Sequence, residues 1–188
     1  RIGDGVMKVL LVTHSIPVAM NAASANGTPA ARYDAQHIRV ASRVAEAAEA
    51  YLGERLDWEL VYCSRSGSPH ISWLEPDVND RLAELTGVAG VVAAPIGFIS
   101  DHMEVAYDLD TQARESAAAA GFDYERAATA GIHPDFIATL ADLLLEQAAV
   151  ARGELAPPDH PCLTEPASCC LPHPQKEQTH VPSASHAR

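Results

Sequence analysis

Short apolar runs that favour β-strands alternate along this chain with longer stretches in which apolar residues recur at helical spacing. The first run, residues 8–13, leads into His14 and is stopped by Pro17. In residues 30–52 the apolar positions instead recur at helical spacing, which predicts an amphipathic helix. The alternation continues through predicted strands at residues 58–63, 88–95 and 124–130 and predicted helices at residues 77–85, 101–119 and 134–152.

Strands separated by helices predict an open parallel sheet with helices on both faces, an α/β fold of the doubly wound type. Ligands of such sheets bind beyond the carboxyl ends of the strands. Three polar segments follow predicted strands: His14, residues 63–65 and residues 97–101. We therefore expect these three segments to meet at one edge of the sheet.

The composition divides the chain into two parts. Residues 1–152 carry the alternating pattern, and the chain of 188 residues, 47% of them hydrophobic, is long enough for one domain with a core. Residues 153–188 are rich in Pro, Ser and His, which predicts a disordered extension. Because Arg1 stands first and Met7 is the first methionine, we expect the chain to be a piece of a longer protein.

The charge pattern excludes some partners. A formal net charge of −12 with only 13 Lys and Arg leaves no basic stripe for phosphates, so nucleic acid is not an expected partner. No apolar stretch approaches the roughly 18–20 residues of a membrane-spanning helix, and the cytoplasm is the expected compartment. No glycine-rich phosphate loop follows any predicted strand, which argues against a nucleotide ligand.

The segment after the third predicted strand is unusually acidic. If residues 101–110 are helical, Asp101, Glu104 and Asp108 share one face. These acids either form a solvated helix start that complements the helix dipole, or offer hard oxygen ligands to a divalent cation, with His102 nearby. His14 is likewise open to two interpretations, a structural histidine or a proton acceptor and metal ligand.

The four cysteines are Cys63, Cys162, Cys169 and Cys170. Cys63 alone is explained as a small buried hydrophobe, and the other three as reactive thiols of a disordered tail. Together they supply the four thiolates that a 2Fe–2S cluster requires.

Four motifs in this order resemble the ferrochelatase family, in its actinobacterial form, over about residues 9–145. They are THSIP (13–17), YCSRSG (62–67), WLEP (73–76) and PIGFISDHME (95–104). The resemblance implies a chelatase-like fold and an enzyme of heme biosynthesis. Its substrates would be Fe²⁺ and a porphyrin, either coproporphyrin III or protoporphyrin IX.

The resemblance also implies roles for individual residues. It makes His14 a metal ligand or proton acceptor and Glu104 the catalytic carboxylate opposite it. Asp101 and His102 belong to the same signature, and Asp108 to an acidic row that conducts iron or protons. One turn beyond Asp108 the row has Gln112 in place of a third acid.

Actinobacterial members of the family carry a 2Fe–2S cluster, and the resemblance makes Cys63, Cys162, Cys169 and Cys170 its ligands. Because Cys169 and Cys170 are adjacent, His173 stays open as a replacement for one of them.

Ferrochelatases consist of two similar halves with the porphyrin cleft between them, and the resemblance covers only the second half. We therefore expect the N-terminal half as a missing partner and little activity from this chain alone. Two rival interpretations are a noncatalytic 2Fe–2S module that senses iron or redox state, and a flavodoxin-like domain that binds another ligand.

Overall fold

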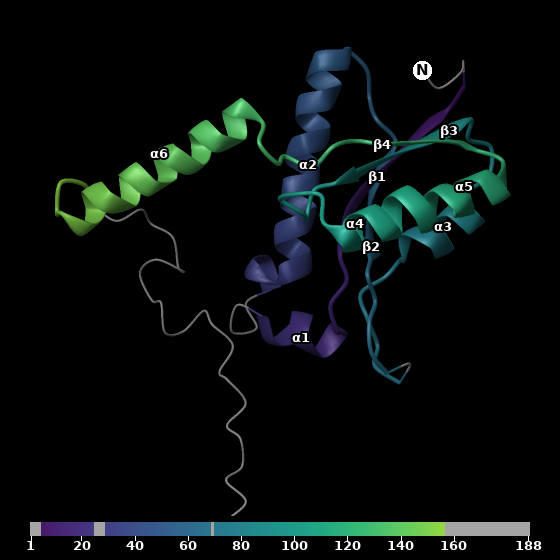
Figure 1. Ribbon diagram of the computed structural model, residues 1–188, viewed down its shortest axis with the longest axis horizontal. Coiled ribbons are helices and arrows are strands. Elements are labelled where there is room, and N and C mark those ends of the chain that lie inside the picture. The colour runs from purple at the N-terminus through teal and green to yellow at the C-terminus, as the bar shows by residue number, and fades with distance from the viewer. Residues whose placement is uncertain (1–4, 25–28, 69, 157–188) are drawn as a thin grey trace, which may run out of the picture.

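A computed structural model describes residues 5–24, 29–68 and 70–156 of the chain. Its centre is a four-stranded parallel sheet in the order β2-β1-β3-β4 (Figure 1). The strands are β1 (Met7–His14), β2 (Trp58–Cys63), β3 (Gly90–Pro95) and β4 (Asp123–Arg126). The predicted open parallel sheet is confirmed, and each strand lies within three or four residues of its predicted bounds.

The chain reverses its direction of travel across the sheet after β2. It passes from β1 outward to β2 at one edge, and then to β3 on the other side of β1 and on to β4. Such a reversal leaves a crevice beyond the carboxyl ends of the two central strands, where doubly wound sheets bind ligands. Here those strands are β1 and β3, so His14 and the segment after Pro95 flank the crevice.

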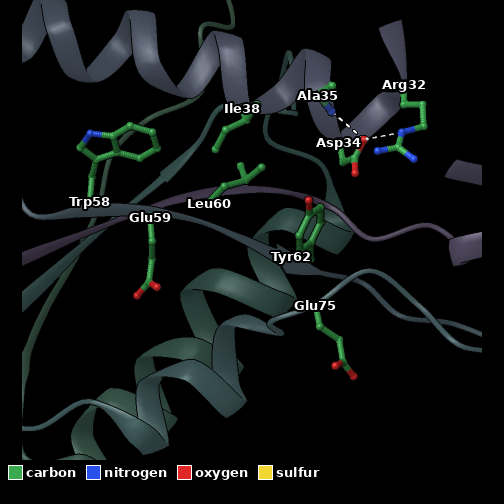
Figure 2. Close-up of a pocket in the computed structure, with 9 residues that line it drawn as sticks. All are labelled: Arg32, Asp34, Ala35, Ile38, Trp58, Glu59, Leu60, Tyr62 and Glu75. Atoms are coloured by element: carbon green, nitrogen blue, oxygen red, sulfur yellow. Dashed lines mark hydrogen bonds and ion pairs between the residues drawn. The ribbon is translucent and has the colours of Figure 1, made fainter. Parts of the chain in front are cut away.

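Helices cover both faces of the sheet, as predicted. On one face lies α2 (Tyr33–Leu52), and on the other lie α3 (Val78–Glu84) and α5 (Arg114–Ala120) (Figures 1 and 2). Strand β2 shows the alternation directly, because Leu60 and Tyr62 point toward α2 while Glu59 points to the opposite side (Figure 2).

The main core lies on the α3 and α5 side of the sheet. Its fully buried members include Leu10, Val12, Val61, Cys63, Val78, Leu82, Val91, Val105 and Leu109. Burial of these apolar side chains is the main driving force that holds the helices to the sheet. The carboxylate of Asp77 caps the start of α3 by accepting from the Asn79 N–H, as an N-terminal capping residue does.

The helix predicted at residues 101–119 is present but differs in form. It begins at α4 (Met103–Val105), continues as the π-helix η3 (Ala106–Ala113) and ends as α5. Asp101 therefore lies before the helix and does not share a helical face with Glu104, which corrects the expected spacing. A π-helical segment has i→i+5 bonds and a wider turn, and such segments are frequent at functional sites.

The remaining helices are α1 (Val18–Ala23), the short 3-10 helix η2 (Pro29–Ala31) and α6 (Pro134–Ala151). Helix α6 projects away from the sheet (Figure 1), and none of its residues is buried. Its apolar side chains are thus left uncovered. No helix of the described residues is long and apolar enough to cross a membrane.

Candidate functional site

His14 and Glu104 meet at the crevice between β1 and β3. His14 is the last residue of β1, and Glu104 lies in α4, ninety positions further along the chain. The imidazole Nε2 is 3.2 Å from Glu104 Oε1. Their side chains keep 34% and 45% of their surface exposed, so a ligand can reach both. The structure therefore brings together the two residues expected to be catalytic.

The other ring nitrogen of His14 defines the tautomer. Nδ1 bonds the carbonyl oxygen of Ser15, and a carbonyl only accepts, so Nδ1 carries a proton. Nε2 is then the ring nitrogen that faces Glu104 Oε1. An imidazole nitrogen beside a carboxylate can take up or release a proton at a reacting atom.

Asp108 lies deeper, on the π-helix η3. Its carboxylate is largely buried and accepts a hydrogen bond from the hydroxyl of Ser64, which follows β2. Ser64 has a φ of 63°, a left-handed conformation that is costly for a residue with a side chain. The structure thus holds a strained backbone in the conformation that directs this hydroxyl to Asp108.

The remaining expected ligands take other partners. Asp101 pairs with Arg126, at 2.9 Å, and Arg126 also binds both oxygens of Asp110. The ring of His102 lies edge-on to Phe98, with 5.5 Å between centroids, and Phe98 lies 6.3 Å from the ring of His14. Within the described residues, no three His, Cys, Asp or Glu side chains are arranged to hold a metal ion.

Cys63 is the one expected cluster ligand within the described residues. Its side chain is 1% exposed and belongs to the core beneath the sheet. The pKa of this thiol is raised to about 12, chiefly by burial. The Ser64 hydroxyl lowers this pKa, and the nearby carboxylates of Asp108, Asp77 and Glu104 contribute to raising it. Metal ligation requires the thiolate, so a bound metal would have to lower this pKa. Cys162, Cys169, Cys170 and His173 lie outside the described residues.

A separate open groove of about 630 Å³ lies between α2 and the edge strand β2 (Figure 2). Its lining includes Arg32, Asp34, Ile38, Trp58 and Tyr62. Neither His14 nor Glu104 lines it, so the candidate site is defined by side-chain chemistry and not by this hollow.

The contacts of three residues of the site could not be predicted from the sequence. Ser64 and Phe98 lie in the motifs at residues 62–67 and 95–104, but the left-handed backbone of Ser64 has no sequence signal. Arg126 and Phe98 act through contacts between elements far apart in the chain.

Known proteins resemble most of this chain in sequence. The sequence pattern of the ferrochelatase family matches residues 3–148. A coproporphyrin III ferrochelatase of Streptomyces griseus subsp. griseus is 48% identical over 174 residues, which cover 84% of this chain and 45% of the relative.

Two further relatives agree with this match. A coproporphyrin III ferrochelatase of Streptomyces coelicolor is 46% identical over 84% of this chain and 43% of its own length. A ferrochelatase of Rhodopirellula baltica is 40% identical over 90% of this chain and 46% of its own length. The chain thus spans about half the length of the curated relatives it matches.

Proposed function

The chain belongs to the ferrochelatase family, and on this premise we propose that it carries the proton-handling half of an enzyme that inserts Fe²⁺ into coproporphyrin III. The choice of coproporphyrin III over protoporphyrin IX follows the names of the Streptomyces relatives. The observation that carries the proposal is the contact between His14 and Glu104 at the crevice between β1 and β3.

The chemistry of the reaction explains why this pair suits it. Inserting the metal releases two protons from the pyrrole nitrogens, so the site needs groups that accept protons at neutral pH. The His14 imidazole and the Glu104 carboxylate are both proton acceptors, and they lie 3.2 Å apart. Asp108, further along the π-helix, supplies another carboxylate on the route by which iron or protons pass.

A site with few protein ligands also suits Fe²⁺ as a substrate. Fe²⁺ must leave its protein ligands for the four nitrogens of the porphyrin, and a closed set of protein ligands would oppose that transfer. His14 and Glu104 offer one nitrogen and one carboxylate, while Asp101 is occupied by Arg126. In this proposal, Asp101 and His102 shape the start of α4 and do not bind iron.

The N-terminal half of the relatives is the proposed partner, and α6 is the surface that it covers. Phe136, Ile137, Leu140, Leu143 and Leu144 fall on one side of α6 at helical spacing, while Asp135, Asp142 and Glu146 fall on the other. Leu143 and Leu144 are 51% and 72% exposed. An apolar helix side of this extent is typical of an interface, and the relatives have about twice the length of this chain.

A 2Fe–2S cluster is a separate proposal, supported by the number of cysteines and not by the described residues. If it forms, we propose that Cys63, Cys162, Cys169 and Cys170 hold it. Anaerobic reconstitution with iron and sulfide tests this: Cys63→Ala and Cys162→Ala should each lose the visible absorption of the cluster. Retention of that absorption in Cys63→Ala would remove Cys63 from the ligands. The cytoplasm stays the expected compartment.

The proposed function is tested with a chimera in which this chain replaces the matching segment of the Streptomyces griseus relative. We expect the chimera to convert coproporphyrin III and Fe²⁺ to the iron porphyrin, followed by the Soret band, and the chain alone to convert little. A chimera that binds coproporphyrin III but inserts no iron would contradict the proposal. The unaltered relative is the positive control.

A further inference from the structure

A side chain from helix α2 binds the backbone of His14. The phenol oxygen of Tyr33 lies 2.7 Å from the carbonyl oxygen of His14 and 3.0 Å from the hydroxyl oxygen of Thr13. Because the phenol proton goes to the carbonyl, the Thr13 hydroxyl donates to the phenol oxygen. The result is a chain of hydrogen bonds from Thr13 through Tyr33 to His14, in which each bond strengthens the next.

The strand geometry explains why this carbonyl needs a side-chain donor. Along a parallel strand, successive residues bond alternately to the two neighbours. Ser15 N–H bonds Cys63 of β2, whereas the carbonyl of Val12 accepts from Gly97 on the β3 side. The backbone carbonyl of His14 points to the β3 side too, but β3 has already ended at Pro95. Tyr33 therefore replaces the N–H that a longer β3 would have supplied.

Tyr33 is itself held firmly. Its backbone N–H donates to the Ser24 hydroxyl, at 3.1 Å, and its ring lies 4.1 Å from the ring of His37. Burial raises the pKa of the Tyr33 phenol, which keeps it protonated and able to donate at neutral pH. The phenol is thus a fixed donor at the first turn of α2.

The backbone of Gly97 lies close against the side chain of Thr13. A side chain at position 97 would collide with the side chain of Thr13, which is fully buried. The absence of a side chain at Gly97 thus leaves the room in which the Thr13 hydroxyl reaches Tyr33.

We propose that Tyr33 is a positioning residue for His14: by binding the carbonyl oxygen of His14 where β1 leaves the sheet, it fixes the imidazole opposite Glu104. This inference rests on the proposed function only in taking His14 as the reacting side chain. Nothing in it requires Tyr33 to touch iron or porphyrin.

The test compares Tyr33→Phe with Tyr62→Phe in the full chain. Tyr62 is also a buried tyrosine on the α2 side of the sheet, and its hydroxyl makes no hydrogen bond to His14 in the described part of the chain. Nitrogen NMR of ¹⁵N-histidine protein, with the His14 signals assigned from His14→Gln, reports the tautomer and the order of the ring. Thermal unfolding of each variant shows whether the fold is kept.

We expect one sharp set of His14 signals with Nδ1 protonated in the wild type and in Tyr62→Phe. In Tyr33→Phe these signals should broaden or move toward the tautomer mixture of a free imidazole. Unchanged His14 signals in a folded Tyr33→Phe variant would overturn the proposal. If Tyr33→Phe does not fold, Thr13→Val is used instead, because it removes the hydroxyl that donates to Tyr33. The His14 signals of Thr13→Val are expected to shift in the same direction by a smaller amount. Unchanged His14 signals in Thr13→Val would then overturn the proposal.

Turnover in the chimera adds a readout that separates this inference from the proposed function. Tyr33→Phe should lower kcat about 10- to 100-fold while leaving KM for coproporphyrin III within about twofold, since misplacement of a reacting group by about 1 Å has effects of this size. Tyr62→Phe should change neither. A chimera without any activity contradicts the proposed function and leaves the NMR result to decide the role of Tyr33.

Discussion

At the scale of single residues, Ser64 shows how a costly local conformation supports the site. Its left-handed backbone directs a hydroxyl to the buried carboxylate of Asp108. Ser64→Ala and Ser64→Gly distinguish the effect of the hydroxyl from the effect of the backbone strain. Both remove the hydroxyl, but Ala keeps the Cβ that makes the left-handed conformation costly and Gly does not.

We expect Ser64→Ala to lower the free energy of unfolding by about 1–3 kcal/mol, since Asp108 loses a donor. Ser64→Gly should lose the same hydrogen bond but recover about 1 kcal/mol from relief of the left-handed strain. Urea unfolding of both variants measures the difference. Equal stability of the Ala and Gly variants would show that the backbone at position 64 is not strained.

The raised pKa of the Cys63 thiol predicts a loss of folding stability at alkaline pH. Its pKa is raised from 9.0 to about 12 in the folded chain, chiefly by burial. Below about pH 9 the thiol is protonated in both states and contributes no pH dependence. Between about pH 9 and pH 12 the unfolded chain releases the proton and the folded chain keeps it, so stability should fall as pH rises.

Urea unfolding at pH 7.5, 9 and 10, roughly spanning the onset of this change, tests the Cys63 prediction. Cys63→Ala removes the thiol and should flatten the decline above pH 9, at the expense of a lower stability at pH 7.5. A decline equally steep in both proteins would assign the effect to other groups, such as Tyr62, whose pKa burial also raises to about 12.

At the scale of elements, the parallel sheet and its helices could be predicted because strand and helix periodicities differ and alternate clearly in this sequence. His14 and the acidic segment were placed at one sheet edge by the same argument. The π-helix η3 could not be predicted, because its widened turn depends on tertiary packing and not on residue spacing. For the same reason Asp101 was placed on a helical face, whereas it lies before α4 and pairs with Arg126.

The bounds of helix α6 were predicted within one residue. Its exposed apolar side could not be predicted, because periodicity shows which side of a helix is apolar but not whether another element covers it. We expect Leu143→Asp to be nearly neutral in the chain alone, because Leu143 is half exposed there. In the chimera the same change should lower the melting temperature by several degrees, as burial of a charge in an apolar contact costs a few kcal/mol.

Ala149→Asp, on the opposite side of α6, is the matched control and should be tolerated in both proteins. Thermal melts of the two variants in both settings give the comparison. If Leu143→Asp were as harmless in the chimera as in the chain alone, α6 would not be the surface that the N-terminal half covers.

At the scale of the whole molecule, the chain joins a complete α/β core to an exposed site and an uncovered helix. The His14–Glu104 pair is formed within this chain, while the relatives have about twice its length. In the proposed function, proton transfer belongs to this chain, and the porphyrin cleft closes only with the missing half of the enzyme.

The most direct test of this division is the rate of iron insertion by the chimera carrying Glu104→Gln, with the exposed Glu115→Gln as control. Glutamine keeps the shape of the side chain but cannot accept the proton, so the rate should fall about 10²- to 10⁴-fold while the dissociation constant for coproporphyrin III stays nearly unchanged. The control should insert iron at the rate of the parent chimera. Insertion by Glu104→Gln at that same rate would remove Glu104 from the mechanism and contradict the assignment of proton transfer to this half.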